Sequence, residues 1–108
     1  MDDRTPRAIL RLQRKLTVEN LWLYIIKILI DEKKSLRAYD LKVKLRERFN
    51  IDPPAVTVYT VIYRMSLDGL ISKVKNGDEI RYQPTKTGIE AFNKAIVILE
   101  EIVSKLKL

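Results

Sequence analysis

The stretch 57–71, TVYTVIYRMSLDGLI, predicts one helix that stops at Gly69 and passes directly into a strand. At about 100° per residue, one face of this helix is apolar and carries Val58, Val61, Ile62 and Met65. The opposite face carries hydroxyl groups, with Val56, Tyr59, Thr60 and Tyr63 at its centre and Thr57 and Arg64 at one flank. A helix that is anchored on one face and polar on the other suits the major groove of DNA.

The residues that follow predict a β-hairpin. Segments 70–75 and 79–84 flank Asn76-Gly77-Asp78, in which Asn-Gly is the pair typical of a type I′ turn. Lys73, Lys75 and Arg81 lie on the two expected strands. A helix followed by a two-stranded ribbon is the core of a winged helix, so we expect a mostly α-helical fold with one small β-ribbon.

An earlier helix completes a helix-turn-helix. Ser35 is a candidate N-cap for a helix that ends near Asn50. Its buried face comprises Ala38, Leu41, Leu45 and Phe49. The pair Pro53-Pro54 marks the start of the next helix, because the fixed φ angles of proline suit a first helical turn. Two helices joined by a short break predict a helix-turn-helix whose second member enters the major groove.

A further helix is expected at 17–31. Thr17 precedes a long apolar run and, with Asn20 in place of the usual Glu or Gln, matches a capping box. Apolar side chains fill both faces of this segment, and Trp22 lies on the second face. The helix should therefore be covered on two sides, once by the domain core and once by a candidate second subunit.

The last part of the chain, after Thr85-Lys-Thr-Gly-Ile89, predicts a long helix that ends at about Leu106. Apolar residues recur there at alternating spacings of three and four, at Ile89, Phe92, Ile96, Leu99, Val103 and Leu106. This heptad pattern favours dimerisation over packing on the chain's own domain, which already has three helices and a ribbon. The expected dimer interface consists of Trp22, Phe92, Ile96, Leu99, Val103 and Leu106. A small-molecule effector at this dimer seam, beside Trp22, is a further hypothesis.

Length and charge limit the classes of protein that fit. The 108 residues suffice for one domain, and the net charge of +7 suits a polyanionic partner. The basic excess lies in segments 1–16 and 35–50. Segment 1–16 is either a basic arm that touches nucleic acid or an ordinary surface helix.

The residue types that are missing exclude most enzymes. The chain has no cysteine and no histidine, which removes Cys/His zinc sites and histidine bases, and we expect no metal and no cofactor. The carboxylates are scattered, and there is no glycine-rich phosphate loop. No apolar run approaches the ~20 residues that span a bilayer. The acidic start, Met1-Asp-Asp3, is unlike a signal peptide, so we expect a cytoplasmic protein. From the missing residue types we expect that it is not an enzyme.

Several short motifs together resemble the PadR family of transcription regulators. They are Thr57-Val-Tyr59, Arg64-Met65, Asp68-Gly-Leu-Ile71, Tyr82-Gln-Pro-Thr85 and Gly88, and Tyr39-Asp-Leu41 is similar to the Tyr-Glu-Ile of that family's second helix. The resemblance covers about residues 17–92. It implies a homodimeric winged-helix repressor whose C-terminal helix crosses the partner. Thr60 and Pro84 depart from the family's usual Pro and Leu, and the short wing puts deep insertion into the minor groove in doubt.

These patterns predict three segments: a basic N-terminal segment 1–16, a winged-helix DNA-binding domain 17–85 and a dimerisation helix 86–108. The expected function is sequence-specific binding of double-stranded DNA by a homodimer at a pseudo-palindromic operator. The expected DNA contacts are Arg37, Tyr39, Thr57, Tyr59, Thr60, Tyr63, Arg64, Lys73, Lys75 and Arg81. Among them, Tyr59 should donate to a phosphate, while Arg64 should either bind a guanine or pair with Asp68. A protein-interaction module built on the same fold remains the alternative.

Overall fold

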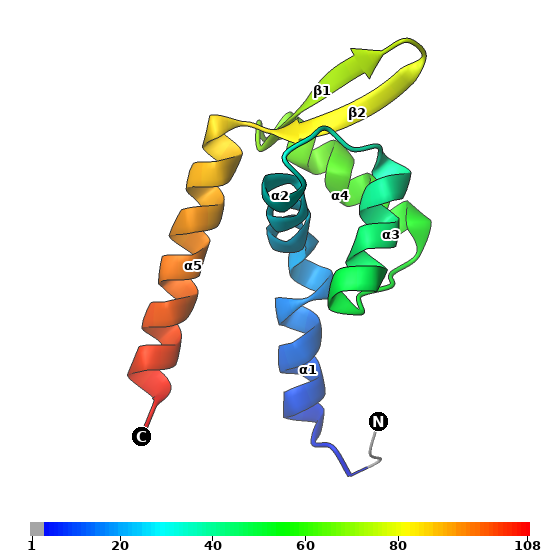
Figure 1. Cartoon of the computed structure of the whole chain (residues 1–108). Coiled ribbons are helices and arrows are strands. Elements are labelled where there is room, and N and C mark those ends of the chain that lie inside the picture. Colours follow the sequence, from blue (N-terminus) through cyan, green and yellow to red (C-terminus); the bar gives the residue numbers. More distant parts are fainter. Residues whose placement is uncertain (1–3) are drawn as a thin grey trace.

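The computed structural model describes residues 4–108 and shows five α-helices, one short 3₁₀ helix and one β-hairpin in that range (Figure 1). The elements are α1 (Arg7–Leu16), the short 3₁₀ helix η1 (Val18–Asn20), α2 (Leu21–Glu32), α3 (Ala38–Phe49), α4 (Ala55–Leu67), β1 (Ile71–Asn76), β2 (Glu79–Pro84) and α5 (Lys86–Leu106). Residues 1–3 lie outside the described residues, and with them the start of segment 1–16 and the acidic residues that argued against a signal peptide. The expected mostly α-helical winged helix is confirmed.

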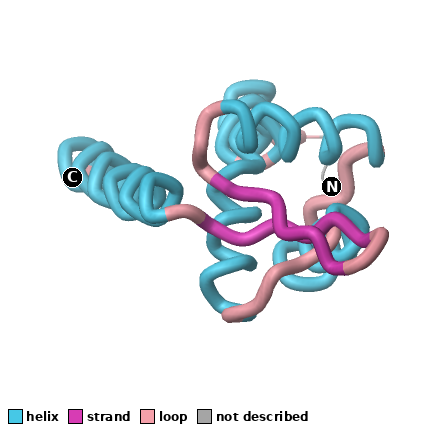
Figure 2. Tube along the Cα trace, turned by 90° about the horizontal axis from the view of Figure 1, so that it is seen from above, coloured by secondary structure: helices cyan, strands magenta, loops and turns pink. Residues whose placement is uncertain are grey.

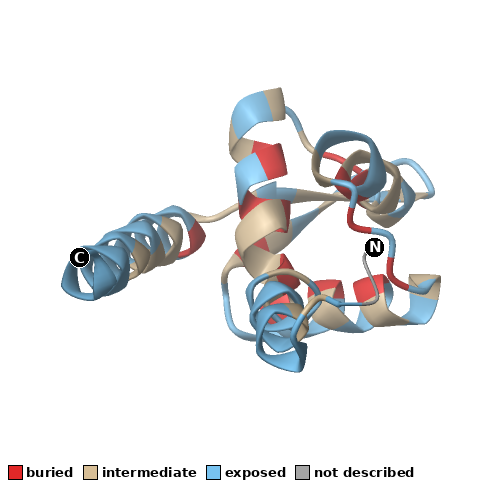
Figure 3. Ribbon diagram, turned by 90° about the horizontal axis from the view of Figure 1, so that it is seen from below, coloured by how far each residue is buried: buried red, intermediate tan, exposed pale blue. Residues whose placement is uncertain are grey.

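The core is built around α2. This helix packs against α3, α4, β2 and the first part of α5, so it is covered on more than one side as expected. Its fully buried residues are Leu21, Ile25, Ile26, Ile28 and Leu29. Figure 3 shows the buried residues gathered in the helical body, while most of α5 is exposed. A second subunit was expected to cover the second face of α2. Part of that face is instead covered by α5 of the same chain.

The capping box predicted at Thr17 is wrong. α1 continues to Leu16, so Thr17 ends that helix, and its hydroxyl donates back to the Gln13 carbonyl at 2.7 Å. The Asn20 side-chain amide likewise donates to the Lys15 carbonyl. Both side chains close the C-terminal end of α1, and η1 then leads into α2.

The N-cap predicted at Ser35 is also wrong, because α3 begins three residues later. Leu36 is held extended by a β-bridge to Tyr82, with N···O distances of 3.0 and 2.7 Å. Arg37 is the N-cap instead, and its backbone N–H donates to the Asp40 carboxylate at 3.1 Å. The expected end near Asn50 is confirmed, since that residue has the left-handed conformation (φ 56°) that often ends a helix.

The hairpin has the expected strands but not the expected turn. Asn76 pairs with Glu79, so the two loop residues are Gly77 and Asp78 rather than Asn76 and Gly77. Among the two, only Gly77 has a positive φ, at +66°. A type I′ turn needs positive φ at both loop positions, whereas glycine at the first position alone is the mark of type II′.

α4 and its stop signal match the prediction. The inner residues Val58, Ile62 and Met65 are buried, and the helix gives way to β1 at Gly69, whose φ is +75°. The helix begins at Ala55, directly after Pro54. Gly69 therefore allows the reversal that carries the chain from a helix into the wing.

α5 leaves the helical body after its first turns. Thr85 caps it, because the Gly88 N–H donates to the Thr85 hydroxyl at 3.0 Å. Figures 1 and 2 show the rest of the helix standing away from the other elements. The radius of gyration is accordingly 15.3 Å, against about 13 Å for a compact chain of this length. Within residues 4–108, no helix is both long and apolar enough to cross a membrane.

Candidate nucleic-acid interface

The exposed face of α4 is the centre of the candidate site. Its outermost side chains, Val56, Tyr59, Tyr63 and Leu67, have between 45% and 70% of their surface exposed. Thr60 lies among them and donates its hydroxyl to the Val56 carbonyl at 2.8 Å, which leaves its oxygen free to accept a hydrogen bond. This face combines hydroxyl groups with exposed methyl groups, the two kinds of group that can reach base edges in a major groove.

Arg64 and Thr57 lie at the flank of this face and are not among its outermost side chains. Arg64 lines a hollow of about 440 Å³, together with Val18, Trp22 and Ala91 from other elements. Asp68 lines the same hollow, yet in the described part of the chain it forms no salt bridge with Arg64. The guanidinium is therefore not held by an acid of the described residues, although Asp68 lies in the same hollow, and it must extend around the helix to reach a base. Binding of an effector at the dimer seam, beside Trp22, stays a prediction.

The wing supplies free positive charge. Lys73 pairs with Tyr82 and Lys75 with Ile80, so both lysines project from the same face of the hairpin. Both side chains are exposed, and neither forms an ion pair within residues 4–108. An unpaired ammonium group can approach a phosphate without first losing an acidic partner.

Arg37 and Arg81 are placed differently, because both already have acidic partners. Arg37 forms two side-chain hydrogen bonds to Asp40, at 3.0 and 2.9 Å, and its guanidinium lies 3.6 Å from Glu79. Arg81 contacts Glu79 at 2.9 Å and the Ser35 carbonyl at 3.2 Å. The hydrogen bonds that Arg37 donates to Asp40 lower the pKa of that carboxyl and raise the pKa of the guanidinium.

The basic excess of segment 35–50 is largely neutralised in the folded chain. Ion pairs join Lys42 to Asp52 at 3.1 Å, Lys44 to Glu32 at 3.6 Å and Arg48 to Asp31 at 2.6 Å. The hydrogen bonds that Asp31 accepts from Arg48 and Lys27 lower the pKa of its carboxyl. Charge summed along the sequence could not reveal these pairs, because their partners lie on other elements.

One further candidate on α3 was missed. Arg46 is exposed, has no ion pair among residues 4–108 and shares a small hollow of about 150 Å³ with Tyr39. Tyr39 itself is 58% exposed. The spacing of seven residues between the two, which is two helical turns, was the signal that could have found the pair.

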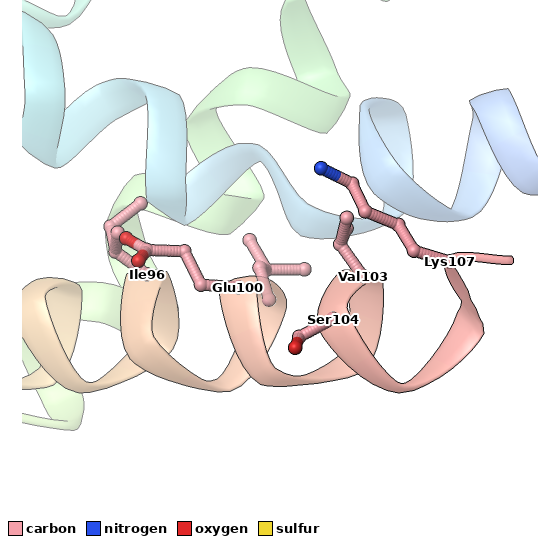
Figure 4. A pocket seen from close by; sticks show the side chains of 6 residues that line it. Ile96, Glu100, Val103, Ser104 and Lys107 are labelled. Atoms are coloured by element: carbon pink, nitrogen blue, oxygen red, sulfur yellow. The ribbon is translucent and has the colours of Figure 1, made fainter.

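The residues expected at a dimer interface fall into two groups. Trp22 and Phe92 are half-buried and pack against the core of their own chain. Farther along α5, Val103 and Leu106 are 51% and 75% exposed. Figure 4 shows Ile96, Val103 and Lys107 rising from α5 toward the N-terminal helices, on the side where a hollow of about 480 Å³ lies along α5.

No metal site is found among the described residues, where no three Asp or Glu side chains come close enough to share an ion. Within the same residues the carboxylates are mostly engaged with lysine and arginine, as at Asp31, Asp40, Asp52 and Glu79.

No protein-family model and no curated protein matches the chain. Its fold is similar to that of several solved structures. A protein from STIV described as a winged-helix DNA-binding protein has a TM-score of 0.69 at 22% identity, over 81% of this chain and 94% of that one. A transcriptional regulator from Clostridium thermocellum has a TM-score of 0.69 at 14% identity, over 96% and 99%. A PadR family transcription regulator from Clostridium difficile has a TM-score of 0.67 at 23% identity, over 79% and 92%.

Proposed function

We propose that this chain is a PadR-like transcription regulator that binds double-stranded DNA in a sequence-specific manner. The observation that carries the proposal is the exposed face of α4, with Tyr59, Thr60 and Tyr63, joined directly to a wing with two unpaired lysines. The descriptions of the solved structures with this fold, which name DNA-binding proteins and transcription regulators, support it.

In the proposed complex, α4 lies in the major groove, which is about 12 Å wide and admits one helix. The tyrosine and threonine hydroxyls bond to phosphates or base edges, and the exposed Val56 and Leu67 can contact thymine methyl groups. Lys73 and Lys75 add phosphate contacts from the wing. Because the outermost side chains of α4 include no arginine, phosphate contacts and DNA shape should contribute a large share of the specificity.

We further propose that the regulator is a homodimer held by α5. The distal half of α5 exposes an apolar stripe of heptad spacing, and a second copy of the same helix would cover it. Two copies related by a two-fold axis would present two α4 helices to a pseudo-palindromic operator. The family resemblance adds the expectation of a repressor, which acts by occupying its operator, and of a cytoplasmic location.

The exposed stripe of α5 also supports the alternative, a module that docks another protein through this helix. The two functions differ in their response to salt. Specific duplex binding should weaken steeply as salt rises, and it should depend on sequence at every salt concentration. A docking module should show only weak charge attraction to any duplex.

The experiment that tests the proposal is selection of bound duplexes from a random pool, followed by titration of the enriched duplex and a scrambled one. We expect an enriched site with two-fold symmetry and a preference of about 10³-fold or more over the scrambled duplex. A pool that returns no common sequence would refute the proposal of a sequence-specific regulator.

The wing lysines give a prediction about affinity. Lys73→Ala combined with Lys75→Ala should weaken binding to all duplexes about equally and reduce the salt slope by roughly one unit for each phosphate that the wing no longer neutralises. The matched control is Lys94→Ala with Lys105→Ala, which removes two exposed cations from α5. Equal salt slopes in the wing variant and the parent would remove the wing from the interface.

Tyr59 on the exposed face of α4 and Arg64 at its flank should have different roles in DNA binding, and two substitutions distinguish these roles. Tyr59→Phe removes only a hydroxyl, so it should cost about 0.5–1.5 kcal/mol for every duplex. Arg64→Ala should instead relax preference at one base pair per half-site, worth about 1–3 kcal/mol if the arginine reaches a guanine. Titrations with the selected site and its single-base variants distinguish the two effects. Unchanged binding in both variants would show that α4 is not the reading helix.

A further inference from the structure

Glu79 contacts two arginines from the tip of the wing, where it directly follows the turn. It is the first residue of β2, and its carboxylate contacts Arg81 at 2.9 Å through one oxygen and Arg37 at 3.6 Å through the other. Arg37 comes from the N-terminus of α3, so Glu79 links the hairpin to the helix-turn-helix. Asp40 and the Ser35 carbonyl take up further donors of the two guanidinium groups.

The register of the hairpin separates these arginines from the wing lysines. Glu79 pairs with Asn76 and Arg81 with Val74, so their side chains lie on the face opposite that of Lys73 and Lys75. One face of the wing therefore carries free cations, while the other carries cations that are already neutralised by an acid.

We propose that Glu79 is a positioning residue that keeps Arg81, and together with Asp40 also Arg37, from binding phosphate and so limits sequence-independent affinity. This inference rests on the proposed DNA-binding function. Each additional phosphate contact strengthens binding to every sequence alike, because phosphates carry no sequence information. A regulator gains discrimination when cations near the duplex are held by acids and only selected ones contact the backbone. Arg37 and Arg81, expected from the sequence to contact DNA, have this different role in the proposal.

The contact can be removed without unfolding the hairpin. Glu79 is 41% exposed at its side chain, and exposed ion pairs contribute little to stability. The wing is also fixed by the two main-chain hydrogen bonds between Leu36 and Tyr82. Glu79→Gln should therefore fold, and it should leave Arg81 without an acidic partner and Arg37 with Asp40 alone.

The test compares Glu79→Gln with Asp78→Asn, in duplex titrations over a series of salt concentrations. Asp78 is the neighbouring residue, and in the described chain it forms no ion pair, so its substitution changes net charge equally without releasing an arginine. We expect Glu79→Gln to bind a scrambled duplex several-fold more tightly at low salt, with a salt slope steeper by about one to two units. Its preference for the selected duplex should fall. Asp78→Asn should keep the parent slope and preference.

A triple variant completes the test. Adding Arg37→Gln and Arg81→Gln to Glu79→Gln should return the salt slope to the parent value, because the freed cations are then absent. If Glu79→Gln keeps the parent slope while parent and control bind DNA, the inference about Glu79 is wrong and the proposed function stands. If the parent binds no duplex, both are wrong.

Discussion

Gly88→Ala should lower the melting temperature of the protein by roughly 10 °C or more. A Cβ atom built at Gly88 lies 2.0 Å from the Leu70 carbonyl oxygen and 2.9 Å from its carbon, and Ile26 Cδ1 is 3.2 Å away. The first two atoms are backbone, so no side-chain rotation can relieve the overlap. Overpacking of this kind costs about 1–3 kcal/mol or more, and each kcal/mol shifts the melting temperature of a domain this size by about 4–8 °C.

Gly69→Ala is the matched comparison for that result. A Cβ at Gly69 has no atom within 4 Å, so the substitution adds only the strain of a positive φ, here +75°. Thermal denaturation followed by circular dichroism should show a smaller loss for Gly69→Ala than for Gly88→Ala. Equal melting temperatures for Gly88→Ala and the parent would mean that α5 is not seated against Leu70.

The expected loss at Gly88 has a consequence for the whole molecule, because this contact joins the body to α5. The Leu70 carbonyl also accepts the Thr85 N–H at 3.1 Å, and the Thr85 hydroxyl donates to the Gly69 carbonyl at 2.5 Å. The end of α4, the start of the wing and the start of α5 are thus fixed to one another. Displacing α5 should also disturb the wing.

Local signals in the sequence were sufficient to predict where an element ends when one residue type determines the backbone conformation. Gly69 marked the end of α4, and the strand 79–84 was predicted at both ends. In each case the decisive interaction lies within a few residues of the signal. The apolar spacing of α4 likewise identified its buried face, because burial follows helical period.

The sequence predictions failed where the local structure depends on a residue that is far away in the sequence. Ser35 has the side chain of an N-cap, but the bridge from Leu36 to Tyr82 keeps the chain extended until Arg37. Arg64 lies at the flank of α4 as predicted, but the hollow beside it could not be predicted, because η1 and α5, which also line it, are far away in the sequence. The engagement of Arg81 by Glu79 and Ser35 likewise depends on how the hairpin meets the loop before α3. Sequence patterns identified the elements of the site but not which of its cations are free.

Leu99→Glu should dissociate the proposed dimer. Leu99 lies at the centre of the α5 stripe and is only half-buried in the single chain, and in the proposed dimer a second copy would complete its burial. A glutamate there would place an unpaired charge in the interface, at a cost of several kcal/mol, on the order of what one short interface supplies. The chain itself should still fold, because this part of α5 stands away from the body.

Analytical ultracentrifugation at micromolar concentration measures the effect, with Val97→Glu as the matched control. Val97 is 53% exposed, and helical spacing places it away from the Phe92, Ile96, Leu99 and Val103 stripe. We expect a dimer for the parent and for Val97→Glu, and a monomer with parent-like circular dichroism for Leu99→Glu. The monomer should bind a half-site weakly and lose the dependence on two-fold spacing, because the second α4 is no longer attached. A monomeric parent would disprove the dimer and leave α5 free for a different partner, which is the docking alternative.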